Sequence, residues 1–270
     1  MTDHEVSRTS DGFVHKRYGH LEDDQPRREW RALQILHEYA PGLAPEPITA
    51  DLDATPPWIT MGVLAGDSLG DQPLSLPQMR AIVAALQRLH TCVPREALAT
   101  VRSCNDPGKG LPNIAGELAA QRRPGDDAIV SRAFDEVLRW LSGAEANRFP
   151  SEDRGLMVFA RGDHNLSNFL WDGDRVRLVD FEYAGKSDRC AEIAELIEHI
   201  SARCTPDRTW DQLLDELDLS RFEGRRVLTI RRLDAIMWFR MLLPGQPGHS
   251  RNPPGTLQMQ AQRLLDLLSA

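Results

Sequence analysis

Polar side chains follow two apolar runs in the segment 159–183, which reads FARGDHNLSNFLWDGDRVRLVDFEY. Asp163 follows an apolar run and a turn at Gly162, and Asn168 comes five positions later. The sequence WDGD predicts a turn, and the alternating run RVRLVD then delivers Asp180 at the end of a second strand. We therefore expect two carboxylates and an amide at the ends of two neighbouring strands.

These residue types suit phosphoryl transfer with a divalent metal ion. Mg²⁺ prefers oxygen ligands, and nucleotide sites hold it with one or two carboxylates plus substrate phosphates. Transfer to a hydroxyl also needs a carboxylate that orients the nucleophile and accepts its proton. The protein-kinase pattern has that carboxylate, an Asn five positions later and a strand-borne Asp-Phe pair, and this chain follows the same order with Asp163, Asn168 and Asp180-Phe181. The alternative is that these polar residues only form turns, as Asx residues often do.

A lysine and a glutamate near the N-terminus independently indicate the same chemistry. On the first predicted helix, Glu29 shares an apolar face with Leu33 and Leu36. A carboxylate on such a face is costly unless it is paired, and the preceding strand FVHKRY offers Lys16. Kinases use a strand lysine held by a helix glutamate to position nucleotide phosphates. The alternative is that Glu29 is a solvated first-turn residue favoured by the helix dipole.

The elements that position these residues divide into a small mixed lobe and a larger helical lobe. Residues 1–63 predict two strands, a helix and two more strands, at 5–9, 13–18, 27–40, 46–53 and 57–63. Residues 64–270 predict mostly helices, at 75–90, 113–122, 127–143, 189–202, 207–217, 222–243 and 256–268. The segment 159–183 is the only convincing β structure in this second part, and 244–255 reads as a Pro/Gly loop. The fold class that follows is α+β.

Composition and charge narrow the class of protein. The chain has 270 residues, 41% hydrophobic and 27% charged, which is enough for one large domain or two lobes. Its net charge of −8 argues against nucleic acid as the main partner and is consistent with a cationic substrate. No apolar run approaches the ~20 residues of a membrane span, and the polar N-terminus lacks the layout of a signal peptide. The four cysteines show no metal-binding spacing, which indicates a reducing compartment. From these observations together we expect a cytoplasmic protein with no membrane partner.

With these residues identified, the chain resembles the aminoglycoside phosphotransferase and choline kinase superfamily of small-molecule kinases. The resemblance runs over most of the chain, through VHKRY, REWRALQIL, PWITMGVLAGDSL, LQRLH, RGDHNLSN, LVDFEYAG and AEIAELIEH. It implies a two-lobed protein-kinase-like fold, with a small β-rich N-lobe at 1–63 that binds nucleotide. The larger, mainly helical C-lobe at 64–270 would carry the catalytic loop and the acceptor-binding helices. ATP and Mg²⁺ are the implied cofactors.

The resemblance also implies the roles of the catalytic residues. Asp163 corresponds to the catalytic base, and Asn168 with Asp180 corresponds to the Mg²⁺ ligands. Lys16 would contact the nucleotide phosphates, and Glu29 would anchor that lysine.

Two further segments are assigned by the same resemblance. The backbone of Met61, Gly62 and Val63 would meet the adenine edge of the nucleotide. Glu192, in AEIAE, stands where the family usually has an aspartate that braces the catalytic loop.

The chain departs from the family pattern at several positions. Arg161 stands two residues before the base, where the family usually has a histidine, and Asn165 and Ser167 replace a histidine and a glycine. Residues 1–12 contain no glycine before Gly12, so we expect a shortened N-lobe without the usual glycine-rich loop over the phosphates.

The leading hypothesis is a Mg·ATP-dependent kinase that phosphorylates a hydroxyl of a small, cationic molecule. An aminoglycoside or another antibiotic is the leading acceptor, and DFEYA favours a choline- or ethanolamine-type amino alcohol as the alternative. Glu182 is a candidate substrate-binding residue, and the acidic stretch 211–218 is either a second candidate or a solvated helix face.

Two other classes of protein stay open from the sequence. A degenerate, kinase-like binding module would retain the fold without catalysis, and the departures at Arg161 and in the short N-lobe favour it. A metal-dependent phosphohydrolase would use the same carboxylates but would not need Lys16 and Glu29. The choice between ATP and GTP and the oligomeric state are not determined by the sequence.

Overall fold

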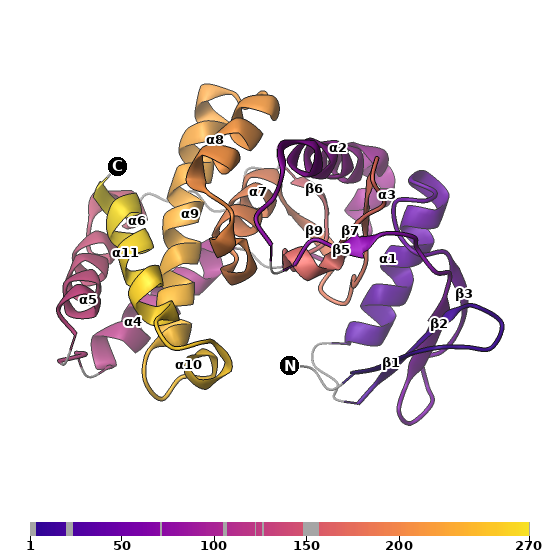
Figure 1. The fold of residues 1–270 in the computed structure, drawn as a ribbon, viewed down its shortest axis with the longest axis horizontal. Coiled ribbons are helices and arrows are strands. Elements are labelled where there is room, and N and C mark those ends of the chain that lie inside the picture. Colours follow the sequence, from indigo (N-terminus) through magenta and orange to yellow (C-terminus); the bar gives the residue numbers. More distant parts are fainter. Residues whose placement is uncertain are drawn as a thin grey trace.

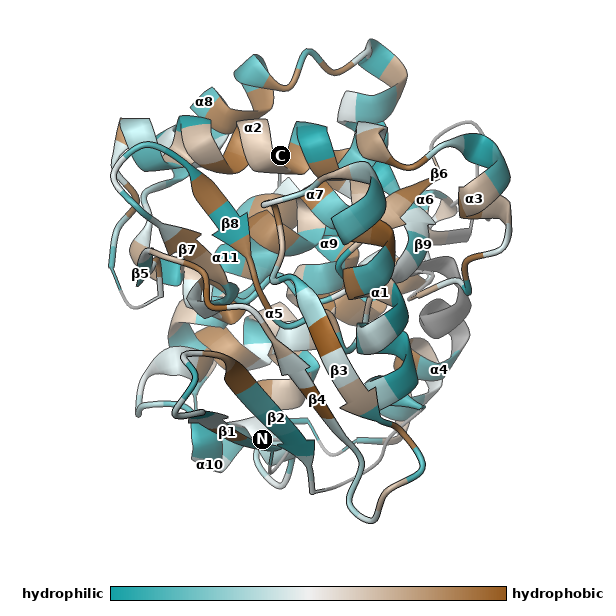
Figure 2. Cartoon of the chain, turned by 90° about the vertical axis from the view of Figure 1, so that its right-hand side faces the viewer, coloured by the Kyte–Doolittle hydropathy of each residue, from teal (hydrophilic) through white to brown (hydrophobic). Residues whose placement is uncertain are grey.

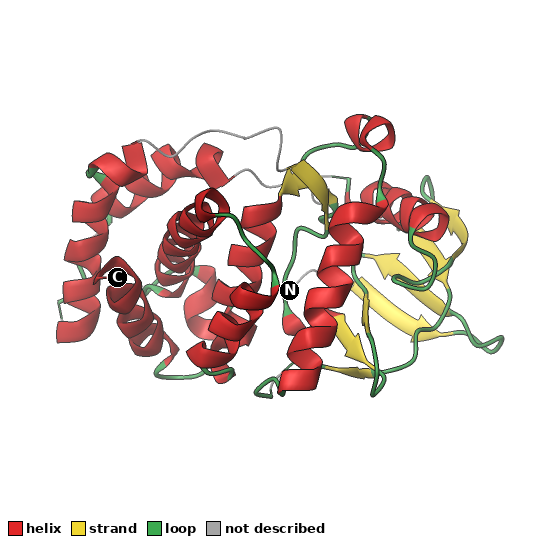
Figure 3. Cartoon of the chain, turned by 90° about the horizontal axis from the view of Figure 1, so that it is seen from above, coloured by secondary structure: helices red, strands yellow, loops and turns green. Residues whose placement is uncertain are grey.

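The computed structural model describes residues 4–19, 24–70, 72–104, 107–121, 123–125, 127–147 and 157–269. Within these residues the chain forms two lobes (Figure 1). Strands and one long helix gather at one end of the molecule, and helices fill the other end (Figure 3). The predicted α+β fold with a small β-rich lobe and a larger helical lobe is therefore confirmed.

The N-terminal lobe is a four-stranded antiparallel sheet of order β1-β2-β4-β3. Its elements are β1 (His4–Arg8), β2 (Val14–Tyr18), α1 (Gln25–Tyr39), β3 (Pro47–Asp51) and β4 (Trp58–Met61). Alternation along β2 buries Lys16 and Tyr18 and exposes Arg17. Helix α1 packs beside β3 and β4 (Figure 2) and buries Glu29 and Leu33. The sheet and the helix thus present Lys16 and Glu29 to the same interior.

The C-terminal lobe is built mainly from helices. They are α2 (Leu76–Cys92), α3 (Arg95–Ala99), α4 (Pro107–Ala120), α5 (Ala128–Leu141), α6 (Ala144–Asn147), α7 (Arg189–Glu198), α8 (Asp207–Glu216), α9 (Arg221–Leu242), α10 (Pro247–Arg251) and α11 (Thr256–Ser269). Helix α9 lies at the centre, between α7 on one side and α5 and α11 on the other, as its apolar sequence predicts. Within the described ranges, none of the helices combines the length and the apolarity needed to cross a membrane.

Several elements differ from the predictions made on the sequence. The predicted helix 189–202 ends at Glu198, because Ser201 N donates to His199 Nδ1 at 3.2 Å and starts a 3₁₀ turn. The predicted Pro/Gly loop contains α10, in which a proline occupies the first turn, and the short helix α3 was not predicted. Residue 122, the predicted end of the helix at 113–122, lies outside the described residues.

Two small sheets between the lobes carry the catalytic segment. Strand β6 (Met157–Ala160) pairs with β9 (Gly185–Asp188), which was not predicted from the sequence. Strand β7 (Phe169–Trp171) forms the predicted hairpin with β8 (Val176–Leu178) and also pairs with β5 (Asp67–Ser68). The β6–β9 pairing sets the end of β6 beside the segment that follows β8, so the loops 161–168 and 179–184 meet.

Candidate active site

The loop after β6 presents Asp163 on a constrained backbone. Gly162 has a φ of 76°, and a Cβ at this position would collide with the carbonyl oxygen of Tyr183, so both conformation and space require glycine. The Asp163 carboxylate accepts from Asn165 N at 3.0 Å and from Asn168 Nδ2 at 3.2 Å. Backbone and side-chain donors therefore hold Asp163 in one orientation next to Asn168.

Asp180 reaches the same region from the end of β8. Val179 N donates to Asn168 O at 3.0 Å, which ties the two segments together. Asp180 has a φ of 63°, an unusual conformation for a non-glycine residue, and its side chain is 33% exposed. The next residue, Phe181, is fully buried, and its N–H donates to Glu29 Oε1 at 3.3 Å. The strained turn thus aims Asp180 into the space between the lobes.

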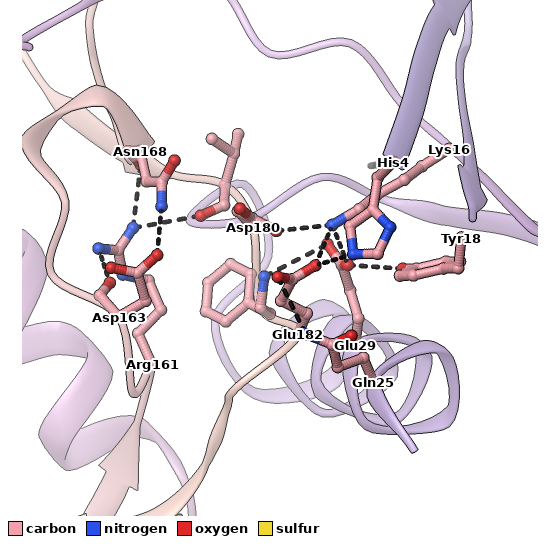
Figure 4. A network of polar contacts seen from close by, with 12 residues as sticks. His4, Lys16, Tyr18, Gln25, Glu29, Arg161, Asp163, Asn168, Asp180 and Glu182 are labelled. Carbon is pink, nitrogen blue, oxygen red and sulfur yellow. Dashed lines mark hydrogen bonds and ion pairs between the residues drawn. The ribbon is translucent and has the colours of Figure 1, made fainter. Parts of the chain in front are cut away.

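Arg161 joins the two loops through their backbone carbonyls (Figure 4). Its guanidinium donates to the carbonyl oxygens of Asn168 and Val179, each at 3.2 Å, and to that of Asp163. It also lies 4.4 Å from the ring centroid of Phe169 and is 1% exposed. An arginine can make these contacts because its planar fork carries five donors, more than the two of a histidine. The arginine that departs from the family pattern therefore organises the loop by other contacts.

Lys16 lies at the centre of a cluster of three carboxylates (Figure 4). Its Nζ is 2.7 Å from Glu29 Oε2, 2.6 Å from Asp180 Oδ1 and 2.9 Å from Glu182 Oε2. Burial acts to lower the pKa of Lys16, but the neighbouring Glu29, Asp180 and Glu182 outweigh it and raise the pKa above its ordinary value. The lysine is therefore firmly charged and joins β2, α1 and the segment after β8.

Glu182 belongs to this cluster and not to an open acceptor cleft. Besides Lys16, it contacts His4 Nε2 at 2.9 Å and accepts from Gln25 Nε2 at 3.2 Å. It is 3% exposed, and burial together with the charge of Asp180 raises its pKa to about 7. This placement favours a role beside the lysine over direct contact with an acceptor.

His164 holds the other side of the catalytic loop to α7. Its Nε2 lies 3.1 Å from Glu192 Oε2 and its Nδ1 lies 3.4 Å from Glu195 Oε2, while Glu192 also accepts from Arg161 N at 3.0 Å. Burial acts to lower the pKa of His164, but Glu192 and Glu195 raise it to about 10. Because the two carboxylates approach opposite ring nitrogens, the arrangement suits a buried imidazolium and not a chelated metal ion. Glu192 thus occupies the bracing position that the sequence predicts.

The open side of Asp163 faces an aromatic pair. His199 Nε2 is 3.9 Å from Asp163 Oδ1, and the His199 ring meets the Trp238 ring edge-on with centroids 5.0 Å apart. Burial acts to raise the pKa of Asp163, but Arg161 and the hydrogen bond from Asn165 N hold it below its ordinary value. Burial lowers the pKa of His199 to about 4. At neutral pH the site therefore has an ionised Asp163 beside a neutral imidazole.

The donor set at Asn168 and Asp180 fits a hard divalent cation. The amide nitrogen of Asn168 is used by Asp163, which leaves its amide oxygen as a ligand atom. One carboxylate oxygen of Asp180 contacts Lys16, and the partly exposed side chain offers the other. An amide oxygen and a carboxylate oxygen beside solvent are the kind of partial ligand set that Mg²⁺ completes with water and phosphate.

The remaining predicted residues lie at the strand that leads out of the N-terminal lobe. Met61 ends β4 with a buried side chain, and Val63 follows it with 40% exposure. Between them, Gly62 N donates to Glu46 O at 2.8 Å.

Three neighbours of Asp163 were not recognised from the sequence. His164, Glu195 and His199 come together only because the loop packs against α7. Their only signal in the sequence is polarity: Glu195 lies among buried apolar residues of α7, and His199 follows the last residue of that helix.

Comparisons with known proteins agree with this geometry. A model of the phosphotransferase enzyme family matches residues 4–228. No curated protein sequence matches the chain. The solved structure of a spectinomycin phosphotransferase in complex with ADP and spectinomycin superposes with a TM-score of 0.67 and 11% identity, covering 99% of this chain and 88% of that one.

Two other solved structures share the fold. A choline/ethanolamine kinase family protein from Mesorhizobium loti has a TM-score of 0.64 and 16% identity, covering 100% of this chain and 86% of that one. The GDP complex of an aminoglycoside 2′-phosphotransferase has a TM-score of 0.67 and 12% identity, covering 98% of this chain and 89% of that one. At these identities the structures establish the fold and leave the acceptor open.

Replacing His164 tests whether it is a buried, charged clamp. We expect His164→Leu to lower the free energy of unfolding by about 3–5 kcal/mol at pH 7, because Glu192 and Glu195 lose their cation. Since the pKa of His164 is raised from 6.5 to about 10, its contribution is complete below the lower value and is lost as the pH rises through the higher one. Urea unfolding of wild type and His164→Leu at pH 7 and pH 10.5 measures the loss of unfolding free energy at each pH.

His90 provides the matched control for this measurement. Burial lowers its pKa to about 4, so it is neutral throughout this range of pH. The destabilisation by His90→Leu should stay constant between pH 7 and pH 10.5. A pH-independent effect of His164→Leu would contradict the charged clamp.

Proposed function

The chain belongs to the phosphotransferase enzyme family, and from that premise we propose that it transfers the γ-phosphoryl group of Mg·ATP to a hydroxyl of a small, cationic molecule. The observation that carries the proposal is the meeting of Asp163, Asn168, Asp180 and Lys16 between the two lobes. Phosphoryl transfer needs positioning and charge stabilisation more than covalent chemistry, and this set supplies both.

Asp163 is the proposed catalytic base. Its lowered pKa keeps it ionised at neutral pH, and two donors fix its carboxylate. An acceptor hydroxyl that donates to this carboxylate is oriented for attack and passes its proton to Asp163 as the new phosphate ester bond forms.

Asn168 and Asp180 are the proposed ligands of Mg²⁺, which when bound would neutralise charge on the nucleotide phosphates. Lys16 is the proposed phosphate contact, and Glu29 is its anchor. The 2.6 Å contact between Lys16 and Asp180 supports a shared position for the phosphates, because both groups point to the same space. A nucleotide entering there exchanges this contact for contacts with its phosphates.

We assign residues 1–63 to the nucleotide-binding lobe and residues 64–270 to the catalytic and acceptor-binding lobe. The backbone at Met61 and Val63 is the proposed adenine contact, since this segment leaves β4 at the junction of the lobes. ATP is the proposed phosphate donor. Structures of similar proteins contain ADP in one case and GDP in another, so a direct comparison of ATP with GTP tests which nucleotide this chain uses.

Acidic residues near Asp163 support a cationic acceptor. Glu195 is 23% exposed at its side chain and lies on α7 beside the catalytic loop, and the whole chain carries a net charge of −8. An aminoglycoside or another antibiotic is the leading acceptor class, and an amino alcohol such as choline or ethanolamine is the alternative. The names of the solved relatives include both classes.

Acceptor-dependent formation of ADP tests the proposal. Purified protein with Mg·ATP is assayed against aminoglycosides, nucleoside antibiotics, ethanolamine and choline, and the phosphorylated product is identified by mass. Release of phosphate without any acceptor would indicate a phosphohydrolase instead. Nucleotide binding without turnover of any acceptor would indicate a kinase-like binding module.

Asp163→Ala should abolish transfer while it leaves the nucleotide site intact. We expect kcat to fall by about 10²–10⁴-fold, because the hydroxyl loses its proton acceptor, and the Kd of Mg·ATP to change little. Steady-state kinetics and isothermal titration measure the two quantities. Asp174→Ala is the matched control, since Asp174 lies in the nearby turn with a side chain 84% exposed; near-native turnover in Asp163→Ala would exclude this base.

Asp180→Asn should weaken the magnesium-dependent part of nucleotide binding. Asn keeps the size of the side chain but removes one charge, so we expect the Mg²⁺ concentration at half-maximal rate to rise by at least about 10-fold. Titration of ATP with and without Mg²⁺ measures the effect independently of turnover. An unchanged dependence on Mg²⁺ would show that Asp180 is not a ligand.

A further inference from the structure

A pocket beside α1 is separate from the proposed active site. It has a volume of about 230 Å³ and is lined by α1, the segment 100–102, β6 and the turn at 181–184. None of the proposed catalytic, metal-binding or nucleotide-binding residues lines it. A ligand in this pocket would lie on a different face of α1 from Glu29, which anchors Lys16.

Four arginines line this pocket together with a single carboxylate. Arg27, Arg28 and Arg31 share one face of α1, because residues three or four positions apart on a helix are neighbours. Arg102 comes from the segment that follows α3, and Asp24 is the one carboxylate of the lining. In a chain with a net charge of −8, this concentration of guanidinium groups is a local reversal of sign.

Arg27 and Arg31 differ in their partners. Arg27 Nε lies 3.6 Å from Asp24 Oδ1, and the same side chain pairs with Asp53. Arg31 is exposed and forms no ion pair with any residue in the described ranges. Because like charges four positions apart on a helix repel each other, an anion bound between these side chains would stabilise the arrangement.

The floor of the pocket is apolar. Ala32 and Ile35 continue the arginine face of α1, and Phe159 and Ala184 come from the opposite side. All four are buried, whereas Arg31 is exposed, so the charged groups lie at the rim and the hydrocarbon lies below them. Such a lining suits a ligand with an anionic head and a short apolar body.

Size and charge narrow the class of ligand. Pockets for drug-sized molecules usually measure about 300–1,000 Å³, so this smaller pocket fits a correspondingly small molecule. Guanidinium groups bind both phosphates and carboxylates through paired hydrogen bonds. A phosphate monoester carries a charge of about −1.5 to −2 near pH 7, and it therefore offsets more of the positive charge than a single carboxylate does.

We propose that the pocket beside α1 binds a small phosphate monoester with an apolar body, at a site separate from the proposed nucleotide site. The arginines at the rim hold the phosphate, and the buried apolar residues contact the body. The existence of this site does not depend on the proposed function, because it uses none of the residues assigned to phosphoryl transfer.

Isothermal titration with phenyl phosphate tests the proposal. Arg31→Gln and Arg102→Gln should each weaken its binding by about 10-fold, since a charge-assisted hydrogen bond is lost. Inorganic phosphate lacks the apolar body and benzoate carries a single negative charge, so both should bind more weakly than phenyl phosphate. A saturating non-hydrolysable ATP analogue with Mg²⁺ should not weaken the binding of phenyl phosphate, because the two sites share no residue.

Arg132→Gln is the matched control, because it makes the same chemical change at an exposed position of α5. It should bind phenyl phosphate as wild type does. The proposal would be overturned by a lack of phenyl phosphate binding, by equal affinity of wild type and both pocket variants, or by tighter binding of benzoate. Displacement of phenyl phosphate by the ATP analogue would also overturn it, since the probe would then occupy the nucleotide site.

Discussion

The charge of Lys16 is the constraint on which the arrangement of the two lobes depends. The residue is 5% exposed, so its ammonium must be matched by carboxylates. Glu29 is supplied by α1 of the same lobe, whereas Asp180 and Glu182 come from the far side of the interface. Because Lys16 contacts carboxylates from both sides of the interface, moving the two sides apart would break buried ion pairs. The cluster therefore fixes where α1 lies relative to the segment 180–182. The contacts that join the lobes thus also fix the position of Lys16, the proposed phosphate contact.

A second requirement is that the loops around Asp163 and Asp180 keep their mutual position. Arg161 links the two loops by donating to carbonyl oxygens of both. His164 holds the first loop from the opposite side through its contacts with α7. The two cations lie on either side of the Asp163 loop and add to the hydrogen bonds that the Asp163 carboxylate accepts from Asn165 and Asn168. The need for a rigid base is a property of the chemistry, and different residue types can satisfy it. For this reason the departure at Arg161 does not imply that the site has lost its order.

The sequence predicts those parts of the site that depend on local pattern. Asp163, Asn168 and Asp180 lie close in sequence on either side of the β7–β8 hairpin. The pairing of Lys16 with Glu29 follows from the periodicity of one strand and one helix. Strand β9 was missed because its pairing with β6 joins segments far apart in the chain, and α10 was missed because its prolines and glycines resemble those of a loop. The contacts of Glu182 and of His164 join distant segments of the chain, so no short window of sequence predicts them.

The two halves of the site carry different electrostatic balances. On the side of the N-terminal lobe, Lys16 lies among three carboxylates and offsets part of their charge. On the side of α7, His164 lies between Glu192 and Glu195 and offsets part of their charge. Both sides of Asp163 therefore keep an excess of carboxylates, which a magnesium-bound nucleotide and a cationic acceptor would offset under the proposed function.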